Sequence, residues 1–405
     1  MVDAIALPPA LQALAGRIVD VDSHEMIPAQ QWVEYFGTGV SELADAWIAS
    51  SVTDKEDKNS SNVPDYAGDV IEITDTIMNV KGTKAPGAVD MARRLEVMDA
   101  IGVNRQLMFP TSVGIWAVTL LMHDKYDPNL LSAITGDRAG KAKAWLKCYN
   151  AWMVDEAKKS DRIRPVPPLI SETIDELMSG AHALVDAGIR AIWLPAGALP
   201  GGKSPAHPDL EPFWTLMEER DCVVTLHLGT EGKLLESLKG WRDAPSFEGY
   251  RTLAEFSTDP WYLSNMHLAA QNFLQTMVLG GVFVRHPNLR VGVIEVGAYW
   301  VGPMMETMDL WYRNLGAFGK RHDALAELPS SYIKSNVKVS VFSFEDIGSY
   351  IERYGLEDVI CFATDYPHVE GGPDMINAMY KKVEKFGNDV VEKFFVKNGE
   401  FLFPD

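Results

Sequence analysis

Eight short runs rich in valine and isoleucine recur along this chain, and stretches with helical periodicity separate them. The runs cover residues 17–22, 104–110, 164–170, 189–195, 222–228, 289–296, 336–342 and 359–365. The amphipathic stretches between them include residues 88–102, 173–188 and 211–221. Strands that alternate with helices form right-handed βαβ units and a parallel sheet. Eight such units predict an α/β protein that closes into a (β/α)₈, TIM-like barrel. Two halves of a doubly wound sheet are the alternative.

Two long polar stretches interrupt this repeat. Residues 50–87 follow the first predicted strand, and residues 228–262 follow the fifth. In a barrel both inserts would rise from the carboxyl ends of the strands, where long loops serve as lids, substrate-binding loops or subunit contacts. Because barrels of this kind exceed the usual domain size, we predict that residues 1–405 form a single domain with these two inserts.

The composition argues against several classes of partner. The chain has 37 Lys and Arg against 56 Asp and Glu, a net charge of −19, and no basic block, which disfavours nucleic acid and anionic membranes. The start of the chain lacks the basic region of a signal peptide, and no apolar run reaches the ~18 residues of a membrane helix. The three cysteines are far apart, so we expect reduced thiols and a cytoplasmic location.

Polar residues stand where four of the predicted strands end. Asp22 and His24 follow the first strand and, being alternate residues, would project to the same side. His227 ends the fifth strand, Glu295 the sixth and Asp365 the eighth. In a barrel these ends converge on one face. Carboxylate oxygens mixed with imidazole nitrogens suit zinc, iron, manganese or cobalt, and a cation would relieve the repulsion between the carboxylates. The sequence therefore predicts a metal site.

Several longer motifs resemble a known family. They are "VDVDSHEMIP", "GAVDMARRLEVMDAIGVNRQLMFP", "AHPDLEPFWTLMEERDCVVTLHLG", "GGVFVRHPNLRVGVIEVGAYWVGPMMETMD" and "ICFATDYPHVEGG". With them the chain resembles the amidohydrolase-related (amidohydrolase 2) family, which includes aminocarboxymuconate-semialdehyde decarboxylase and γ-resorcylate decarboxylase. The resemblance spans nearly the whole chain. It implies a metal-dependent (β/α)₈ barrel and carries the family's metal ligands over onto Asp22, His24, His227 and Asp365.

One position departs from the pattern of the decarboxylases in that family. Those relatives place a histidine after the sixth strand, thought to activate the metal-bound water, whereas this chain has Glu295. A glutamate can act as a general base, or as an oxygen ligand to a second metal. His267, in a helical segment before that strand, is then the candidate sixth ligand. The set of six resembles that of the dinuclear non-haem iron oxygenases reported as an offshoot of the family.

The resemblance implies a metal-dependent enzyme that hydrolyses or non-oxidatively decarboxylates a small organic substrate. The candidate catalytic residues are Glu295, Asp365 and His368. The expected cofactor is a divalent metal ion, zinc for a mononuclear site and iron or manganese for a dinuclear one. The alternatives are a dinuclear or mixed-metal monooxygenase, and a catalytically inert paralogue that partners an active subunit. The expected assembly is a homo-oligomer, such as a dimer, or a hetero-oligomer with a paralogue.

Overall fold

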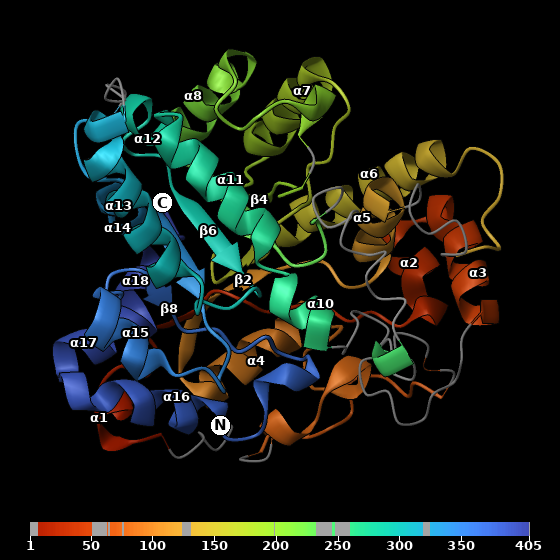
Figure 1. Ribbon diagram of the computed structural model, residues 1–405. Coiled ribbons are helices and arrows are strands. Elements are labelled where there is room, and N and C mark those ends of the chain that lie inside the picture. The colour runs from red at the N-terminus through yellow and green to blue at the C-terminus, as the bar shows by residue number, and fades with distance from the viewer. Residues whose placement is uncertain are drawn as a thin grey trace. The chain divides into compact units, whose positions relative to one another are not determined.

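The chain divides into two compact units. In the computed structural model (Figure 1), unit 1 comprises Met1–Pro168, Leu235–Asn265 and Thr364–Asn377, and unit 2 comprises Leu169–Leu234, Met266–Ala363 and Ala378–Asp405. The structure describes residues 7–50, 63, 65–74, 77–123, 131–197, 199–231, 245–247, 260–318 and 325–404.

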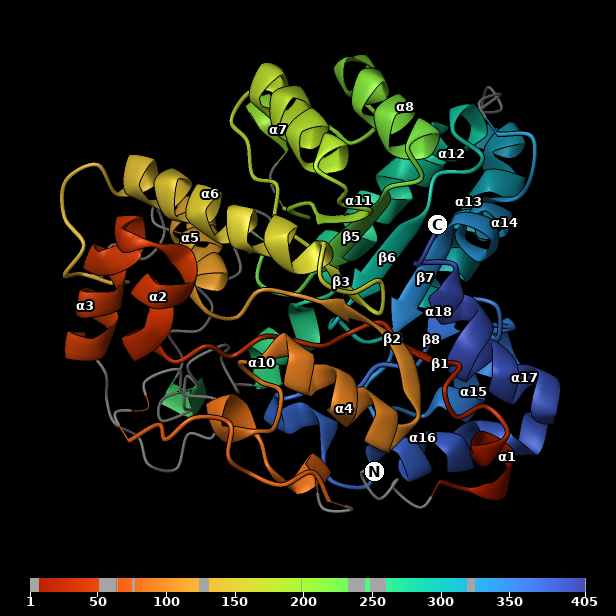
Figure 2. The ribbon, with the colours of Figure 1, turned by 180° about the vertical axis from the view of Figure 1, so that it is seen from behind.

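Unit 1 contains a parallel sheet of three strands in the order β1-β2-β3. The strands are β1 (Ile18–Asp20), β2 (Val103–Met108) and β3 (Ile163–Pro165). Its α-helices are α1 (Pro9–Gln12), α2 (Trp32–Phe36), α3 (Ser41–Ser50), α4 (Met91–Ile101), α5 (Val113–His123), α6 (Arg138–Ala157) and α10 (Pro260–Asn265). Figure 2 shows α5 and α6 side by side, with α2 packed on α6. The helix α4 packs against β2, the strand that follows it in the chain.

Unit 2 contains a parallel sheet of five strands in the order β4-β5-β6-β7-β8. The strands are β4 (Ala191–Trp193), β5 (Val223–His227), β6 (Val291–Ile294), β7 (Val337–Ser340) and β8 (Ile360–Cys361). Its longer helices are α7 (Ile174–Asp186), α8 (Glu211–Glu219), α11 (Leu268–Leu279), α13 (Val301–Phe318), α14 (Pro329–Asn336) and α15 (Ile347–Tyr354), and the chain re-enters this unit within α16 (Met375–Val383). The shorter ones are α12 (Val282–Arg285), α17 (Asn388–Glu392) and α18 (Asn398–Glu400). In both views α11 lies beside α13 and α14 (Figures 1 and 2).

Local sequence signals explain where these elements begin and end. Every residue of β4 to β8 is buried, which fits the uninterrupted apolar runs of a parallel sheet covered on both faces. Thr173 and Glu176 form a capping box at the start of α7. Asp90 caps the start of α4, and Gly102 ends it in the left-handed conformation that glycine adopts without strain.

The predicted elements are confirmed at the level of strands and helices. Each of the eight predicted runs overlaps one observed strand, in chain order and all in parallel pairs, although β2 and β3 each begin one residue earlier than predicted. The helices α4, α7 and α8 lie within the three amphipathic stretches. Large parts of both predicted inserts, 50–87 and 228–262, lie outside the described residues. The single domain over residues 1–405 stays a prediction. Among the helices of the described part of the chain, none has the length and apolar character needed to cross a bilayer.

Candidate metal centre

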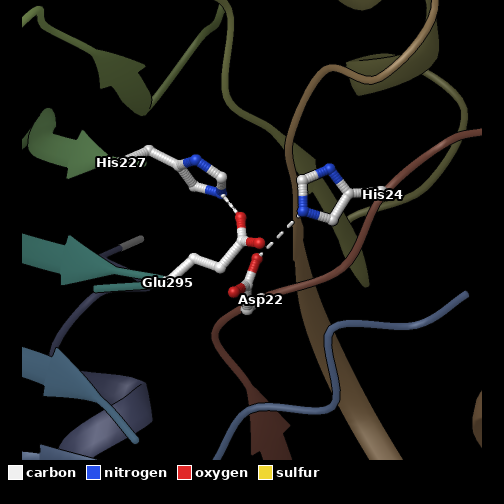
Figure 3. Close-up of side chains that lie close together, drawn as sticks. All are labelled: Asp22, His24, His227 and Glu295. Carbon is white, nitrogen blue, oxygen red and sulfur yellow. Dashed lines mark ion pairs between the residues drawn. The ribbon is translucent and has the colours of Figure 1, made fainter. Parts of the chain in front are cut away.

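Asp22 and His24 lie just beyond β1 in unit 1, and both are buried. Nε2 of His24 is 3.4 Å from Oδ1 of Asp22, and Figure 3 draws this pair as a dashed line. Backbone hydrogen bonds fix this segment, since the amide of His24 donates to the carbonyl of Tyr366 and that of Asp365 to the carbonyl of Asp22. The residues after β8 thus lie alongside the residues after β1.

Asp365 brings a second carboxylate to the same imidazole. Its Oδ1 is 3.4 Å from Nε2 of His24 and 3.0 Å from Nδ1 of His368. His24, Asp365 and His368 each offer one ligand atom within 4.8 Å of the others, and all three are buried. Asp365 has a φ of 52°, a left-handed backbone that is rare for a residue with a side chain. Such conformations cost about 1–3 kcal/mol and cluster at functional sites.

Buried polar residues behind this cluster hold its backbone. Asp20 accepts hydrogen bonds from Nε2 of Gln106 at 2.7 Å and from the amide of Thr364 at 2.8 Å, so it ties β1 to β2 and to the residues before Asp365. Burial raises the pKa of Asp20 to about 7. Arg94 donates from Nη2 to the carbonyl of His24 at 2.6 Å and stacks on the ring of Tyr366. The guanidinium of Arg94 therefore holds the residues that follow β1 and β8, and it does not lie on a solvated face of the helix.

Glu25 points away from the cluster and anchors the loop after β2. Its Oε1 accepts from the amides of Thr111 and Ser112, at 3.0 and 2.8 Å. The same oxygen accepts from the hydroxyl of Tyr149 at 2.6 Å. Burial raises the pKa of Glu25 despite these donors. Glu25 is thus a structural residue that positions Thr111, whose hydroxyl lies 3.1 Å from Nδ1 of His24.

Unit 2 carries its own pair of candidate ligands. His227 is the last residue of β5, and Glu295 follows β6. Nε2 of His227 is 3.1 Å from Oε2 of Glu295, and both side chains are buried (Figure 3). Nδ1 of His227 lies 3.1 Å from the carbonyl oxygen of Leu228. Glu295 also has a left-handed backbone, with φ of 58°, and its amide donates to Oγ of Ser340.

His267 stands at the start of α11 in unit 2 and faces an aromatic partner. Its Nδ1 is 2.9 Å from the hydroxyl of Tyr299, and its ring is stacked near Trp300. Burial lowers the pKa of His267. The loop with Tyr299 is held by Glu345, which accepts from the amides of Ala298 and Tyr299. Tyr299 therefore orients His267 and leaves its Nε2 as the atom available for another contact.

The spacing of these donor atoms meets the requirements of a divalent cation. Ligand atoms about 2.0–2.2 Å from one metal ion, in tetrahedral or octahedral geometry, lie roughly 2.8–3.6 Å apart. The distances from Nε2 of His24 to Oδ1 of Asp22 and of Asp365 fall in this range, and the distance from Nε2 of His227 to Glu295 would also fit in the alternative in which Glu295 is a ligand. Both histidines have Nδ1 beside an oxygen, of Thr111 and Leu228, as metal-binding histidines usually do. The residues fit a divalent metal ion.

The structure brings the predicted site residues together in two groups. Unit 1 joins Asp22, His24, Asp365 and His368. Unit 2 joins His227 with Glu295 and holds His267 on a separate partner, Tyr299.

Sequence reasoning missed the residues that support these groups. It considered acids and imidazoles at strand ends, whereas Thr111 is a hydroxyl residue just beyond β2. Applying the strand-end rule to hydroxyl residues would have found Thr111. Arg94 and Tyr299 carry no comparable signal, because a helical or loop position does not reveal what a long side chain reaches.

Comparisons with known proteins agree with the fold. The family model described as Amidohydrolase matches residues 131–404. No curated protein matches the sequence. A solved amidohydrolase from Mycobacterium avium subsp. paratuberculosis K-10 is similar in structure, with 16% identity, coverage of 96% of this chain and 99% of that one, and a TM-score of 0.64.

Two decarboxylases have a similar structure as well. One is the 5-carboxyvanillate decarboxylase of Novosphingobium aromaticivorans, solved with manganese and 4-hydroxy-3-methoxy-5-nitrobenzoic acid (17% identity, 99% and 98% coverage, TM-score 0.56). The other is the 2,6-dihydroxybenzoate decarboxylase of Rhizobium (18% identity, 96% and 98% coverage, TM-score 0.55). At these identities the likeness concerns the fold alone. With the family match over two thirds of its length, the chain belongs to the amidohydrolase family and has that family's TIM-barrel fold.

Proposed function

We propose that the two groups of side chains form one centre that binds a divalent metal ion, within a single barrel domain of residues 1–405. In a TIM barrel the carboxyl ends of the strands meet on one face, and each candidate ligand lies at or just beyond such an end. The ligands would be Asp22, His24, His227 and Asp365, each of them buried. The manganese in the decarboxylase of similar fold supports a divalent ion.

The reaction we propose is metal-dependent hydrolysis of a small organic substrate. When bound, such an ion lowers the pKa of a water molecule or polarises a carbonyl group. The observation that carries the proposal is Glu295, a buried carboxylate 3.1 Å from Nε2 of His227. An ionised carboxylate only accepts hydrogen bonds, so Glu295 is suited to take a proton from the attacking water at Oε1 or Oε2.

Non-oxidative decarboxylation is the second candidate, and the pair of Asp365 and His368 favours it. Loss of carbon dioxide requires a proton to be delivered to the carbon atom that loses the carboxylate. Nδ1 of His368 lies 3.0 Å from Oδ1 of Asp365, and both side chains are buried, so the two groups can hold and pass a proton. The decarboxylases of similar fold suggest hydroxybenzoates as the substrates to try first.

The family match does not favour the dinuclear monooxygenase or the inert paralogue. In the dinuclear alternative, His267 and Glu295 would bind a second ion. The choice among zinc, iron and manganese, the homo-oligomer and the cytoplasmic location stay predictions.

The experiment that tests the proposal begins with the metal content of protein purified without chelator, measured by elemental mass spectrometry. We expect about one divalent ion per chain, with none in the His24→Ala variant and wild-type content in His182→Ala, which changes an exposed histidine on α7. Wild-type protein without metal, or His24→Ala with full content, would contradict the proposed centre.

A substrate panel then separates the two reactions. Hydroxybenzoates are followed by carbon dioxide release, and amides, esters and lactones by acid release. Turnover of either class that stops with chelator and returns with manganese supports metal-dependent catalysis, and the class that reacts decides between the two candidates. A metal-loaded enzyme that consumes dioxygen with substrate would overturn both in favour of oxygenation.

A further inference from the structure

One hydroxyl group lies between two buried imidazole rings in unit 1. Oγ1 of Thr111 is 3.1 Å from Nδ1 of His24 and 3.1 Å from Nε2 of His368. The two rings are stacked, with their centroids 3.9 Å apart and an angle of 19° between their planes. All three side chains are buried. The contacts of this single hydroxyl therefore affect both histidines.

The number of hydrogens on these three groups limits which nitrogen of each imidazole can carry one. A threonine hydroxyl has one hydrogen to donate, and a neutral imidazole has one N–H and one acceptor nitrogen. Nε2 of His24 faces Oδ1 of both Asp22 and Asp365 at 3.4 Å, longer than an ordinary N–H···O hydrogen bond. If this Nε2 is to bind a metal ion, the hydrogen of neutral His24 must sit on Nδ1.

This position of the His24 hydrogen determines where the hydrogens of Thr111 and His368 lie. Nδ1–H of His24 donates to Oγ1 of Thr111, so the hydroxyl hydrogen is left to donate to Nε2 of His368. His368 must then carry its own hydrogen on Nδ1. That atom is 3.0 Å from Oδ1 of Asp365, an ordinary hydrogen-bond distance. One chain of hydrogen bonds results, from His24 through Thr111 and His368 to Asp365.

We propose that Thr111 is a positioning residue that sets the tautomers of both histidines. It leaves Nε2 of His24 for the metal ion and makes His368 a donor to Asp365 rather than a ligand. Both parts of this statement rest on the proposed function, because they assume that Nε2 of His24 binds a metal ion. Thr111 does not touch the metal or the substrate, and acts through the orientation and protonation of its two neighbours.

The backbone of Thr111 is fixed well enough for this role. Its amide donates to Oε1 of Glu25 at 3.0 Å, and Glu25 is in turn held by Ser112 and Tyr149. The Thr111 side chain is 4% exposed, so water competes little for its hydroxyl. Hydrogen-bond partners of metal-binding histidines typically change metal affinity 10–100-fold when removed.

The test compares Thr111→Val, which keeps the shape and removes the hydroxyl, with Thr111→Ser, which keeps the hydroxyl. Thr119→Val is the matched control, because it removes a hydroxyl whose hydrogen bond, to the carbonyl of Ile115, lies within α5. The first readout is the tautomer of each histidine in metal-free, ¹⁵N-histidine-labelled protein, from two-bond nitrogen–proton spectra assigned with His24→Asn and His368→Asn. The second is manganese affinity by isothermal titration calorimetry.

We expect Nδ1–H on both His24 and His368 in the wild type, in Thr111→Ser and in Thr119→Val. Thr111→Val should shift at least one ring toward Nε2–H and weaken manganese binding about 10–100-fold. Wild-type His368 with its hydrogen on Nε2 would overturn the proposal, even if Thr111→Val did not fold. So would Thr111→Val with unchanged tautomers and affinity. A wild type with the expected tautomers that binds no manganese would reject the proposed metal centre but support the role of Thr111 in tautomer selection.

Discussion

Tyr149 donates its phenolic hydroxyl to Oε1 of Glu25 at 2.6 Å, although the two residues are 124 positions apart in the chain. Burial raises the pKa values of both groups above their usual ranges. The bond connects α6 to the residues that follow Asp22 and His24 in the chain. A change in this hydrogen bond should therefore affect both the stability of unit 1 and the geometry of the candidate site.

Removing this hydroxyl should destabilise the protein. We expect Tyr149→Phe to lower the free energy of unfolding by about 1.5–3 kcal/mol, because a buried carboxylate loses a donor. Urea denaturation followed by circular dichroism measures the change. Tyr35→Phe is the control, since Tyr35 is half-buried on α2 and its hydroxyl bonds to no residue that the structure describes. Equal effects of the two substitutions would show that the Glu25 contact adds nothing.

Metal binding should stabilise the folded chain. A ligand that binds the folded state alone adds about 4 kcal/mol at a thousand times its dissociation constant. We therefore expect manganese to raise the melting temperature of the wild type and of His182→Ala, but not of His227→Ala. Differential scanning calorimetry with and without chelator checks this. A manganese-dependent rise in His227→Ala equal to that of the wild type would remove His227 from the ligand set.

Glu295 should act in catalysis without being required for metal binding. On the substrate found by the panel, we expect Glu295→Gln to lower kcat by about 10²–10⁴-fold, the usual contribution of a general base. The metal content should stay at about one ion per chain. If the ion is lost together with activity, Glu295 is a ligand and the base lies elsewhere.

His267 distinguishes a mononuclear from a dinuclear centre. It is held by the hydroxyl of Tyr299 and belongs to neither of the two groups that share ligand distances. We expect His267→Ala to leave the metal content unchanged. A fall from two ions to one in this variant, seen by elemental mass spectrometry, would establish the dinuclear alternative.

A surface ion-pair network in unit 2 should give a measurable dependence of stability on pH. Glu211 accepts from Arg285 and lies 3.0 Å from Nε2 of His286. Chiefly because of Arg285, its pKa is below the usual value of 4.5. The stabilisation is therefore present above about pH 4.5 and is lost as the pH falls through the lower pKa of the folded state. Since Glu211 is partly exposed, we expect Glu211→Gln to cost up to about 1 kcal/mol at pH 7 and progressively less below pH 4.5. Urea denaturation across this range would reject the prediction if the difference did not shrink.

The order of strands and helices could be predicted because their periodicity is a local property of the sequence. The polar strand ends followed from the same pattern, and they include Asp22, His24, His227, Glu295 and Asp365. The environment of Arg94 could not be predicted in the same way. Its place in an amphipathic helix is typical of a surface residue, but Arg94 is 1% exposed and donates to the carbonyls of Gly87 and His24.

The supporting contacts could not be predicted because they join residues far apart in the chain. Thr111 reaches His368 across 257 positions, and Asp20 reaches Thr364 across 344. Periodicity places a residue on a face of one element and says nothing about which distant side chain meets it. Residues 50–87 and 228–262 were predicted only as inserts, since their polar composition carries no repeat.

The left-handed backbone at Glu295 and Asp365 affects how the sequence of this protein can evolve. Glycine would relieve the strain at either position, whereas the acids keep it. Selection for stability alone would therefore drive both positions toward glycine, and each carboxylate persists only under an opposing demand. We expect Glu295→Gly to be more stable than Glu295→Ala, and the same order at position 365. A single substitution by glycine at either position would then remove a carboxylate of the site and relieve the backbone strain of the folded protein.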